Sequence, residues 1–345
     1  MINESVQQQF AGRSGYLNTA TVGLPPRATM EAVSQALGHW EQGRCDPVEF
    51  DADVERARRA YARIAGTEES AVAILSQVSV ASGMVAASLP DGARVLCPEE
   101  DFSSLLFPFL ADSRLKVQTV PLARLLDAIG SDTDLVAVSA AQSADGRVID
   151  LDALAEVAVA TGTRTYVDVS QAAGWLPLDA GRFDVTACGA YKWLCSPRGS
   201  GFITVGPKAD WLTPRYPGWY SGDDPWVSLY GPPLRMADDA RRFNVSPAWF
   251  DFTGAAPAVE LIADTGVEAI NKHSVGLAND FRRRAGLAPS DSAIVSLDTP
   301  HGAALAEVGV AAVVRAGKVR LSFYLYSTSD DVNRAADALQ LPAAP

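Results

Sequence analysis

Strand-like and helical segments alternate from about residue 30 to residue 205, and this order constrains the fold more than any other feature of the sequence. The apolar runs that read as strands are ARVLCP (93–98), DLVAVSAA (134–141), TRTYVDVS (163–170), FDVTACGA (183–190) and SGFITVG (200–206). The helical patterns lie at 51–66, 79–89 and 150–162. Such alternation is typical of a parallel sheet with helices on both faces, so the predicted fold class is α/β.

The pattern changes after this region. Residues 213–250 are rich in Pro, Gly, Trp and Tyr and are too long for a simple connector, which predicts a functional surface segment. Helical patterns at 254–286 come next, followed by strand-like runs at 291–298, 308–317 and 318–326 and a helix at 329–340. We therefore expect an N-terminal segment (1–29), a large domain (30–245) and a small C-terminal α+β domain (246–345).

Composition narrows the class of partner. The chain has 345 residues, of which 48% are hydrophobic, enough for a large core and a smaller one. A formal net charge of −12 argues against nucleic acid or an anionic membrane surface as a partner. The first residues lack a basic start followed by an apolar run, and no stretch offers the roughly 18 apolar residues of a membrane span, so we expect a cytoplasmic protein. Its scattered cysteines and histidines lack metal-site spacing, so we expect no bound metal and a small-molecule substrate.

Two charged residues, Asp168 and Lys192, come at the carboxyl ends of neighbouring predicted strands. Parallel α/β sheets bind their ligands at these strand ends. Alone, Asp168 reads as a helix N-cap or loop acid, and Lys192 as a solvated surface charge. Together they favour another interpretation, because apolar and aromatic neighbours lower the pKa of a lysine and make a neutral amine available as a nucleophile. Pyridoxal 5'-phosphate (PLP) requires such a pair: the amine forms a Schiff base, and the carboxylate keeps the pyridine nitrogen protonated.

Residues 167–205, VDVSQAAGWLPLDAGRFDVTACGAYKWLCSPRGSGFITV, resemble the central block of class V aminotransferase-fold enzymes. These PLP-dependent enzymes of fold type I include cysteine desulfurases, kynureninase, isopenicillin N epimerase and the carbon–sulfur lyase of ergothioneine biosynthesis. The resemblance extends over nearly the whole chain. It implies the PLP-dependent transferase fold, with a large domain built on a mainly parallel sheet, a small C-terminal domain, and an N-terminal segment that contributes to the active site.

The resemblance also implies cofactor contacts for individual residues. Val78 and Ser79 match the turn that holds the phosphate, although a serine there also reads as a helix cap. Phe102 matches an aromatic residue stacked on the cofactor ring, and a core phenylalanine is the alternative. Gln171 is expected to hydrogen-bond the phenolic oxygen, and Tyr191 to reach the phosphate.

Two further positions bear on the phosphate. Gly189 departs from the serine of the desulfurase pattern, so one phosphate ligand is missing or supplied elsewhere. Ser246 matches a hydroxyl residue that reaches the phosphate of the neighbouring subunit. This match implies a homodimer with shared active sites.

Substrate contacts are implied in the same way. Arg320 matches an arginine that binds the substrate α-carboxylate, a pairing that suits the guanidinium fork, with an exposed strand arginine as the alternative. Asn18 and Thr19 match a stretch that lines the substrate pocket, and Gln142 is a further candidate. Trp219, with its aromatic neighbours, either shapes a pocket for a bulky thiol or packs in the core or dimer interface.

The reaction is the least constrained part of the interpretation. No cysteine follows Cys195, which argues against a persulfide-forming desulfurase because that chemistry needs a reactive thiolate on a C-terminal loop. The runs PGWYSGDDPW and ARRFNVSPAW resemble ergothioneine-type lyases and epimerase-like enzymes of secondary metabolism. The leading hypothesis is therefore β-elimination from a cysteine S-conjugate. Transamination, epimerisation, decarboxylating deamination as in lincosamide-type pathways, and a PLP-fold protein without turnover are the alternatives.

Overall fold

The computed structural model describes residues 2–342, and its large domain is built on one seven-stranded sheet. Its strands are β1 (Val72–Leu75), β2 (Arg94–Pro98), β3 (Lys116–Val120), β4 (Leu135–Ser139), β5 (Arg164–Asp168), β6 (Val185–Gly189) and β7 (Gly201–Val205), in the order β1-β7-β6-β5-β4-β2-β3. Strands β2 to β6 pair in parallel, whereas β7 runs antiparallel to both β6 and β1. The carboxyl ends of β1 to β6 therefore share one edge of the sheet.

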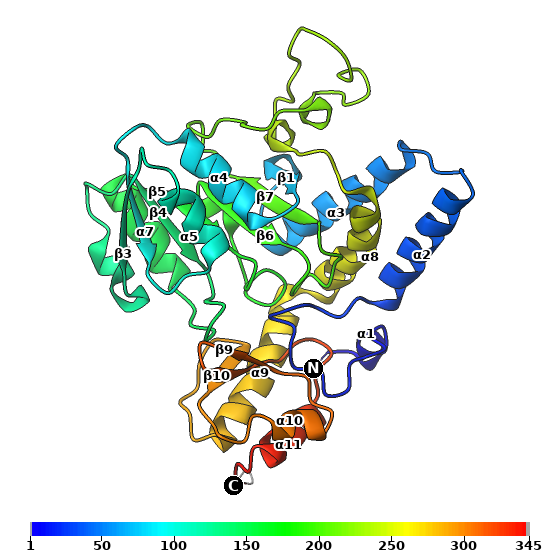
Figure 1. The fold of residues 1–345 in the computed structure, drawn as a ribbon, viewed down its shortest axis with the longest axis vertical. Coiled ribbons are helices and arrows are strands. Elements are labelled where there is room, and N and C mark those ends of the chain that lie inside the picture. Colours follow the sequence, from blue (N-terminus) through cyan, green and yellow to red (C-terminus); the bar gives the residue numbers. More distant parts are fainter. Residues whose placement is uncertain (1, 343–345) are drawn as a thin grey trace.

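Helices cover both faces of this sheet (Figure 1). The α-helices of the chain are α1 (Glu4–Gln7), α2 (Arg27–Glu41), α3 (Glu49–Ala65), α4 (Val78–Ser88), α5 (Ser103–Leu110), α6 (Leu125–Ala128), α7 (Leu151–Thr161), α8 (Trp249–Thr265), α9 (Val267–Arg284), α10 (Ala304–Glu307) and α11 (Ser329–Ala338). Alternate residues of one strand enter different apolar clusters: Val136 and Val138 join one, and Leu135 and Ala137 the other. Both faces are thus buried, and the α/β class is confirmed.

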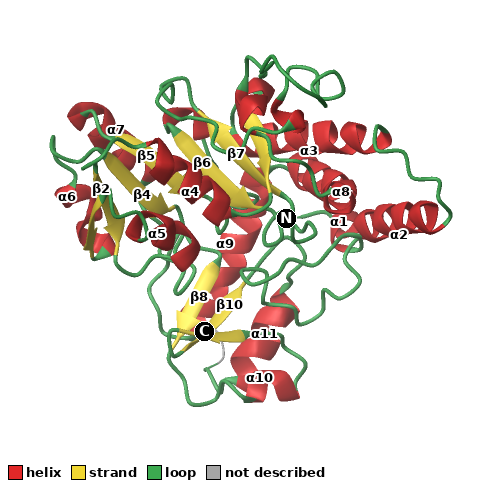
Figure 2. Cartoon of the chain, turned by 45° about the horizontal axis from the view of Figure 1, so that its top comes forward, coloured by secondary structure: helices red, strands yellow, loops and turns green. Residues whose placement is uncertain are grey.

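The small domain has its own three-stranded antiparallel sheet, in the order β8-β10-β9. Its strands are β8 (Ile294–Leu297), β9 (Val313–Arg315) and β10 (Lys318–Ser322), and Figure 2 shows them below the large sheet. This sheet shares a separate apolar cluster with α9 and α11. The predicted C-terminal α+β unit is present, as expected for fold type I.

The expected domain division at residue 246 assigns α8 to the small domain, but in the structure α8 belongs with the large domain. It packs against α2 and α3 of the large domain, and the chain reaches the small sheet only through α9 (Figure 1). The helical patterns expected over 254–286 correspond to α8 and α9, which are separated at Gly266 with φ +85°.

The N-terminal segment joins the two domains. Tyr16 and Asn18 form isolated bridges with Ala311 and Ser322 of the small domain. A few residues later the backbone N–H of Gly23 donates to the carbonyl of Tyr191 at 2.9 Å. Residues 16–23 therefore run from the small sheet to the turn that carries Lys192.

Several elements are additional to the predicted set, namely the short strands β1 and β3 and the helices α1, α2, α5, α6 and α10. The segment after β7 contains two short 3-10 turns, η4 (Trp219–Ser221) and η5 (Ala240–Phe243), and part of it protrudes from the large domain (Figure 1). Within residues 2–342, no helix combines the length and apolar character that crossing a membrane demands.

Candidate functional site

A cavity of about 410 Å³ opens at the carboxyl edge of the large sheet. Its lining residues are Ser76, Gln77, Val78, Phe102, Ser104, Asp168, Ser170, Gly189, Tyr191, Lys192, Arg198 and Gly199. They come from the ends of β1, β2, β5 and β6 and from the turn before β7. The fold thus brings five of the predicted cofactor residues to one place.

Lys192 is almost fully buried, with 7% of its surface exposed. Its Nζ lies 5.4 Å from the centroid of the Phe102 ring and 5.7 Å from that of Tyr191. Burial lowers the pKa of Lys192, and the carboxylate of Asp168 opposes this shift in part. A lower pKa raises the fraction of neutral amine at neutral pH, which is the form that attacks a carbonyl or accepts a proton.

Asp168 ends β5 and is also buried. Its Oδ1 accepts a hydrogen bond from the backbone N–H of Ser170 at 2.8 Å, and its side chain lines the cavity. Burial raises the pKa of this carboxyl, while the charge of Lys192 counteracts the rise. A buried carboxylate at a cavity suits a ligand that offers a cationic N–H.

The opposite side of the cavity suits an anion. Val78 begins α4, and the side chain of Gln77 at the N-cap makes no capping hydrogen bond, so the first N–H groups of the helix are available. Ser79, one residue further on, is half-buried and does not line the cavity. The exposed guanidinium of Arg198 lies 5.1 Å from the centroid of the Tyr191 ring and adds positive charge.

The sequence did not indicate Arg198 and Asp101 as residues of the site. Arg198 follows Pro197 in the turn after Lys192, and only that position could have suggested it. Asp101 is buried and accepts hydrogen bonds from the backbone N–H groups of Ser139 at 2.8 Å and Phe102 at 2.7 Å. It thereby fixes the turn that presents Phe102 to Lys192.

Gln171 lies beside the cavity without lining it. Its Nε2 donates to the carbonyl of Ala20 at 2.9 Å and to Oγ of Ser143 at 3.1 Å, and its Oε1 accepts from the indole N–H of Trp193 at 2.8 Å. The predicted contact with the cofactor phenolic oxygen stays a prediction, because it requires one of these donor hydrogens to change partner.

Arg320 is a buried cation without an acidic partner among the described residues, and only 2% of its surface is exposed. Its Nη1 donates to the backbone oxygen of Ser143, and its Nη2 to Oγ1 of Thr21 at 2.7 Å. Burial and the charge of Arg315 lower the pKa of Arg320 to about 10. The Arg320 charge also helps to lower the pKa of Lys192. A carboxylate ligand would compensate this charge.

The other three predicted substrate residues near the N-terminal segment do not line the cavity. The hydroxyl of Thr19 is fully buried and pairs with Tyr326 at 2.5 Å. Gln142 donates to Asp101 at 3.1 Å. Oε1 of Gln142 and Oδ1 of Asn18 are both buried without a hydrogen-bond partner among the described residues. Both atoms can therefore still accept a hydrogen bond.

The two predicted residues of the 213–250 segment also lie outside the cavity. Trp219 packs against Tyr220 and Trp226, with ring centroids 5.0 and 5.2 Å apart. Tyr220 and Trp226 both donate to the carboxylate of Asp51 on α3, at 2.9 and 2.6 Å. Within one chain, Trp219, Tyr220 and Trp226 therefore pack on α3. The contacts of a single chain do not support a substrate-pocket role for Trp219. Ser246 is exposed.

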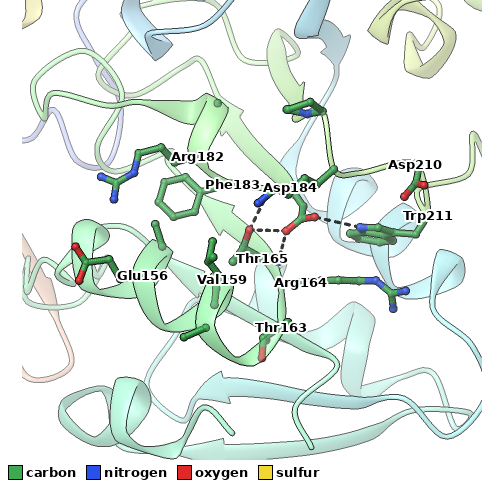
Figure 3. Close-up of a pocket in the computed structure, with 17 residues that line it drawn as sticks. Glu156, Val159, Thr163, Arg164, Thr165, Arg182, Phe183, Asp184, Asp210 and Trp211 are labelled. Carbon is green, nitrogen blue, oxygen red and sulfur yellow. Dashed lines mark hydrogen bonds between the residues drawn. The ribbon is translucent and has the colours of Figure 1, made fainter. Parts of the chain in front are cut away.

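A larger hollow, of about 760 Å³, lies at the opposite edge of the sheet, where β5 and β6 begin (Figure 3). Asp184 accepts there from the backbone N–H of Thr165 at 2.8 Å and from the indole of Trp211 at 3.3 Å. The guanidinium of Arg164 lies over the ring of Trp211 (Figure 3). These groups stabilise one another and offer no buried lysine–carboxylate pair, so the cavity at the carboxyl edge is the candidate site.

The backbone of Gly23 lies so close to the backbone of Lys192 that no side chain fits at position 23. A Cβ at this position would overlap the backbone oxygen of Lys192 and lie 3.0 Å from Cα of Cys195. Gly23→Ala should lower the free energy of unfolding by about 1–3 kcal/mol and reduce PLP content, because backbone atoms cannot yield as a flexible side chain does. Thermal unfolding and cofactor absorbance measure the two effects.

Gly38→Ala is the matched control. Gly38 lies within α2, and an added Cβ would meet nothing within 4 Å. Alanine should stabilise that helix by roughly 0.5–1 kcal/mol and leave PLP content unchanged. Equal behaviour of the two variants would contradict the proposed contact at Gly23.

Comparisons with known proteins agree with this geometry. Residues 48–289, more than half of the chain, match the family model described as aminotransferase class-V. An uncharacterized aminotransferase, YcbU, of Bacillus subtilis (strain 168) is 28% identical over 311 residues, which cover 83% of this chain and 82% of the relative. Isopenicillin N epimerase of Streptomyces clavuligerus is 27% identical over 379 residues, covering 94% and 93%.

The fold is also similar to solved structures of the cystine C-S lyase C-DES. One, a complex with its reaction product cysteine persulfide, superimposes with a TM-score of 0.82 at 21% identity, covering 96% of this chain and 99% of that one. A mutant of C-DES that carries glycine covalently linked to its PLP cofactor gives a TM-score of 0.82 at 22% identity, covering 97% and 99%.

Proposed function

The chain belongs to the class-V aminotransferase family and is a PLP-dependent enzyme, and on this premise we propose that it is a carbon–sulfur β-lyase. Its substrate would be a cysteine S-conjugate, and its products a thiol, pyruvate and ammonia. The observation that carries the amino-acid part of the proposal is that Lys192 and Asp168 are buried and line one cavity, while Arg320 is a buried cation outside that lining, without an acidic partner among residues 2–342, whose charge acts on Lys192.

The residues of the cavity fit PLP. The buried carboxylate of Asp168 lines the cavity, where it would hold the protonated ring nitrogen. The uncapped start of α4, Arg198 and Tyr191 would hold the phosphate, and Phe102 would stack on the ring. When bound, PLP supplies an electron sink for bonds at the α-carbon of an amino acid.

The side chains of the chain would then divide the remaining tasks. The Nζ of Lys192 holds the cofactor before substrate enters, and afterwards takes the α-proton as a general base. Arg320 binds the α-carboxylate and orients the α-carbon toward Lys192. The C–S bond then breaks, its electron pair leaves with sulfur, and a proton completes the thiol. Water hydrolyses the remaining three-carbon unit to pyruvate and ammonia.

The cysteine inventory supports a lyase over a persulfide-forming desulfurase. Cys97, Cys188 and Cys195 are buried, and burial raises the pKa of each thiol. Cys45 is partly exposed but lies between α2 and α3, among residues that line a different hollow. A thiolate that attacks the substrate sulfur therefore has no evident source within residues 2–342.

The direct test is to incubate the PLP-loaded enzyme with a series of S-substituted cysteines. We expect stoichiometric thiol, pyruvate and ammonia. A keto acid that retains the thioether would indicate transamination, inverted amino acid would indicate epimerisation, and carbon dioxide with hydrogen peroxide would indicate decarboxylating deamination. Absence of pyruvate with every thioether would refute the lyase, and absence of any turnover would favour a PLP-binding protein without catalysis.

The family resemblance further supports a homodimer with shared sites as part of this proposal. Ser246 is exposed and stands outside its own chain's cavity, so its hydroxyl is accessible to a partner. Large apolar side chains are exposed on α2 and on the protruding segment, namely Met30, Leu37, Trp40, Val227, Tyr230 and Leu234. Such surfaces are typical of association. The mass of the purified protein in solution tests the dimer.

A further inference from the structure

The guanidinium of Arg320 is held by parts of the chain that are far apart in sequence. Arg320 lies on β10 of the small domain, and Ser143 follows β4 in the large domain. Thr21 belongs to the N-terminal segment and accepts from Nη2 of Arg320 at 2.7 Å. A guanidinium has five N–H donors, and the contacts with Ser143 and Thr21 use at most three of them. Donors therefore remain for a carboxylate.

The segment that carries Thr21 is fixed on both sides of that residue. The backbone N–H of Ala20 donates to Oγ of Ser322 on β10 at 3.1 Å. The N–H of Gly23 donates at 2.9 Å to the carbonyl of Tyr191, the residue before the lysine. The segment thus sets the distance between β10, which bears the arginine, and the turn that bears the lysine.

We propose that Thr21 is a positioning residue, whose hydroxyl fixes the Arg320 guanidinium in the orientation that a substrate α-carboxylate requires when the α-carbon faces Lys192. This inference rests on the proposed amino-acid substrate. A hydrogen bond between a neutral acceptor and a buried cation is directional, so its loss allows the side chain to turn toward the other oxygen acceptors nearby. Ser143 is such an acceptor, because its backbone oxygen already binds Nη1.

The variant that tests this role is Thr21→Val, which keeps the β-branched shape and removes the acceptor. We expect the dissociation constant of amino acids, measured by the change in PLP absorbance, to rise by about 10- to 100-fold, as for the loss of a hydrogen bond to a charged group. The kcat should change by less than about threefold, and PLP content and Tm should stay near wild type. Thr21→Ser should restore binding. Thr265→Val removes a partly buried hydroxyl at the end of α8 and should change nothing at the site.

A second readout separates positioning from a purely structural role. The wild type should bind S-ethylcysteine more tightly than its α-carboxamide, and Thr21→Val should reduce this preference. An unchanged preference, or equal weakening by Thr21→Val and Thr21→Ser with a lower Tm, would overturn the inference. If amino acids bind with a Thr21-dependent carboxylate preference but no pyruvate forms, the lyase proposal fails and the positioning role stands. If no amino acid binds to the wild type, both fail.

Discussion

Replacing Lys192 with alanine is expected to abolish turnover and the covalent attachment of PLP. Lys192 supplies the only amine among the residues that line the cavity, and its Nζ faces the rings of Phe102 and Tyr191. The loss of the nucleophile and of the general base together should lower kcat by at least about 10³-fold. Borohydride reduction followed by mass spectrometry measures attachment, and pyruvate release measures turnover.

Lys208→Ala provides the control for that experiment. Lys208 is exposed and lines the hollow at the opposite edge of the sheet, so its loss should leave attachment and turnover unchanged. The wild-type apoprotein should bind PLP covalently with a pH midpoint below the ordinary pKa of lysine, because burial lowers the pKa of Lys192. An unchanged absorbance spectrum in Lys192→Ala would refute the role given to this residue.

The second large effect is expected for Asp168→Asn. The variant removes the buried charge that would hold the ring nitrogen protonated, and kcat should fall by about 10²- to 10³-fold, as for other preorganised electrostatic groups. The carboxylate of Asp168 also raises the pKa of Lys192. Its removal should therefore shift the pH midpoint of PLP attachment to a still lower value.

The apoprotein of Asp168→Asn should be at least as stable as the wild type. Burial raises the pKa of Asp168, so its ionised form is less favourable in the folded than in the unfolded state. That cost applies above the carboxyl pKa, including neutral pH, and asparagine avoids it. Tm measured without PLP, beside kcat measured with it, separates function from stability.

Asp184→Asn should show the reverse behaviour. Its Oδ2 accepts from the backbone N–H and hydroxyl of Thr165 at 2.8 and 2.9 Å (Figure 3), and Asp184 lines the hollow at the other edge of the sheet from the candidate site. Asparagine in place of this acceptor should lower Tm and leave kcat nearly unchanged. If Asp168→Asn instead lost stability and kept its kcat, the assignment of Asp168 to the cofactor would be wrong.

Local patterns predicted five of the seven strands of the large sheet, because each of those five is a short apolar run. The five strands expected between residues 93 and 206 correspond to β2, β4, β5, β6 and β7. The same patterns placed Asp168 and Lys192 at the ends of β5 and β6. A parallel sheet makes such strand ends neighbours whatever the intervening sequence.

Other residues of the site could not be found in this way. Arg198 and Thr21 are ordinary loop residues in the sequence, and they matter because of what they approach: the Tyr191 ring for the first, and the Arg320 guanidinium for the second. For Trp219 the sequence left a pocket role and a packing role open, and in the structure it packs against Tyr220 and Trp226, which hydrogen-bond Asp51 of α3. The fate of a loop side chain depends on contacts with distant segments.

The sequence by itself determined the α/β class and the lysine–carboxylate pair, because these depend on periodicity and on residues at strand ends. It also indicated the family, because residues 167–205 resemble the central block of that family. Only the tertiary structure decided that α8 packs with the large domain, that Gln171 has protein partners for its amide, and that Arg320 is held by Thr21 and Ser143. The physical reason is that these contacts join segments from different parts of the chain. Their distances are set by the packing of two domains and an N-terminal segment, which no local pattern contains.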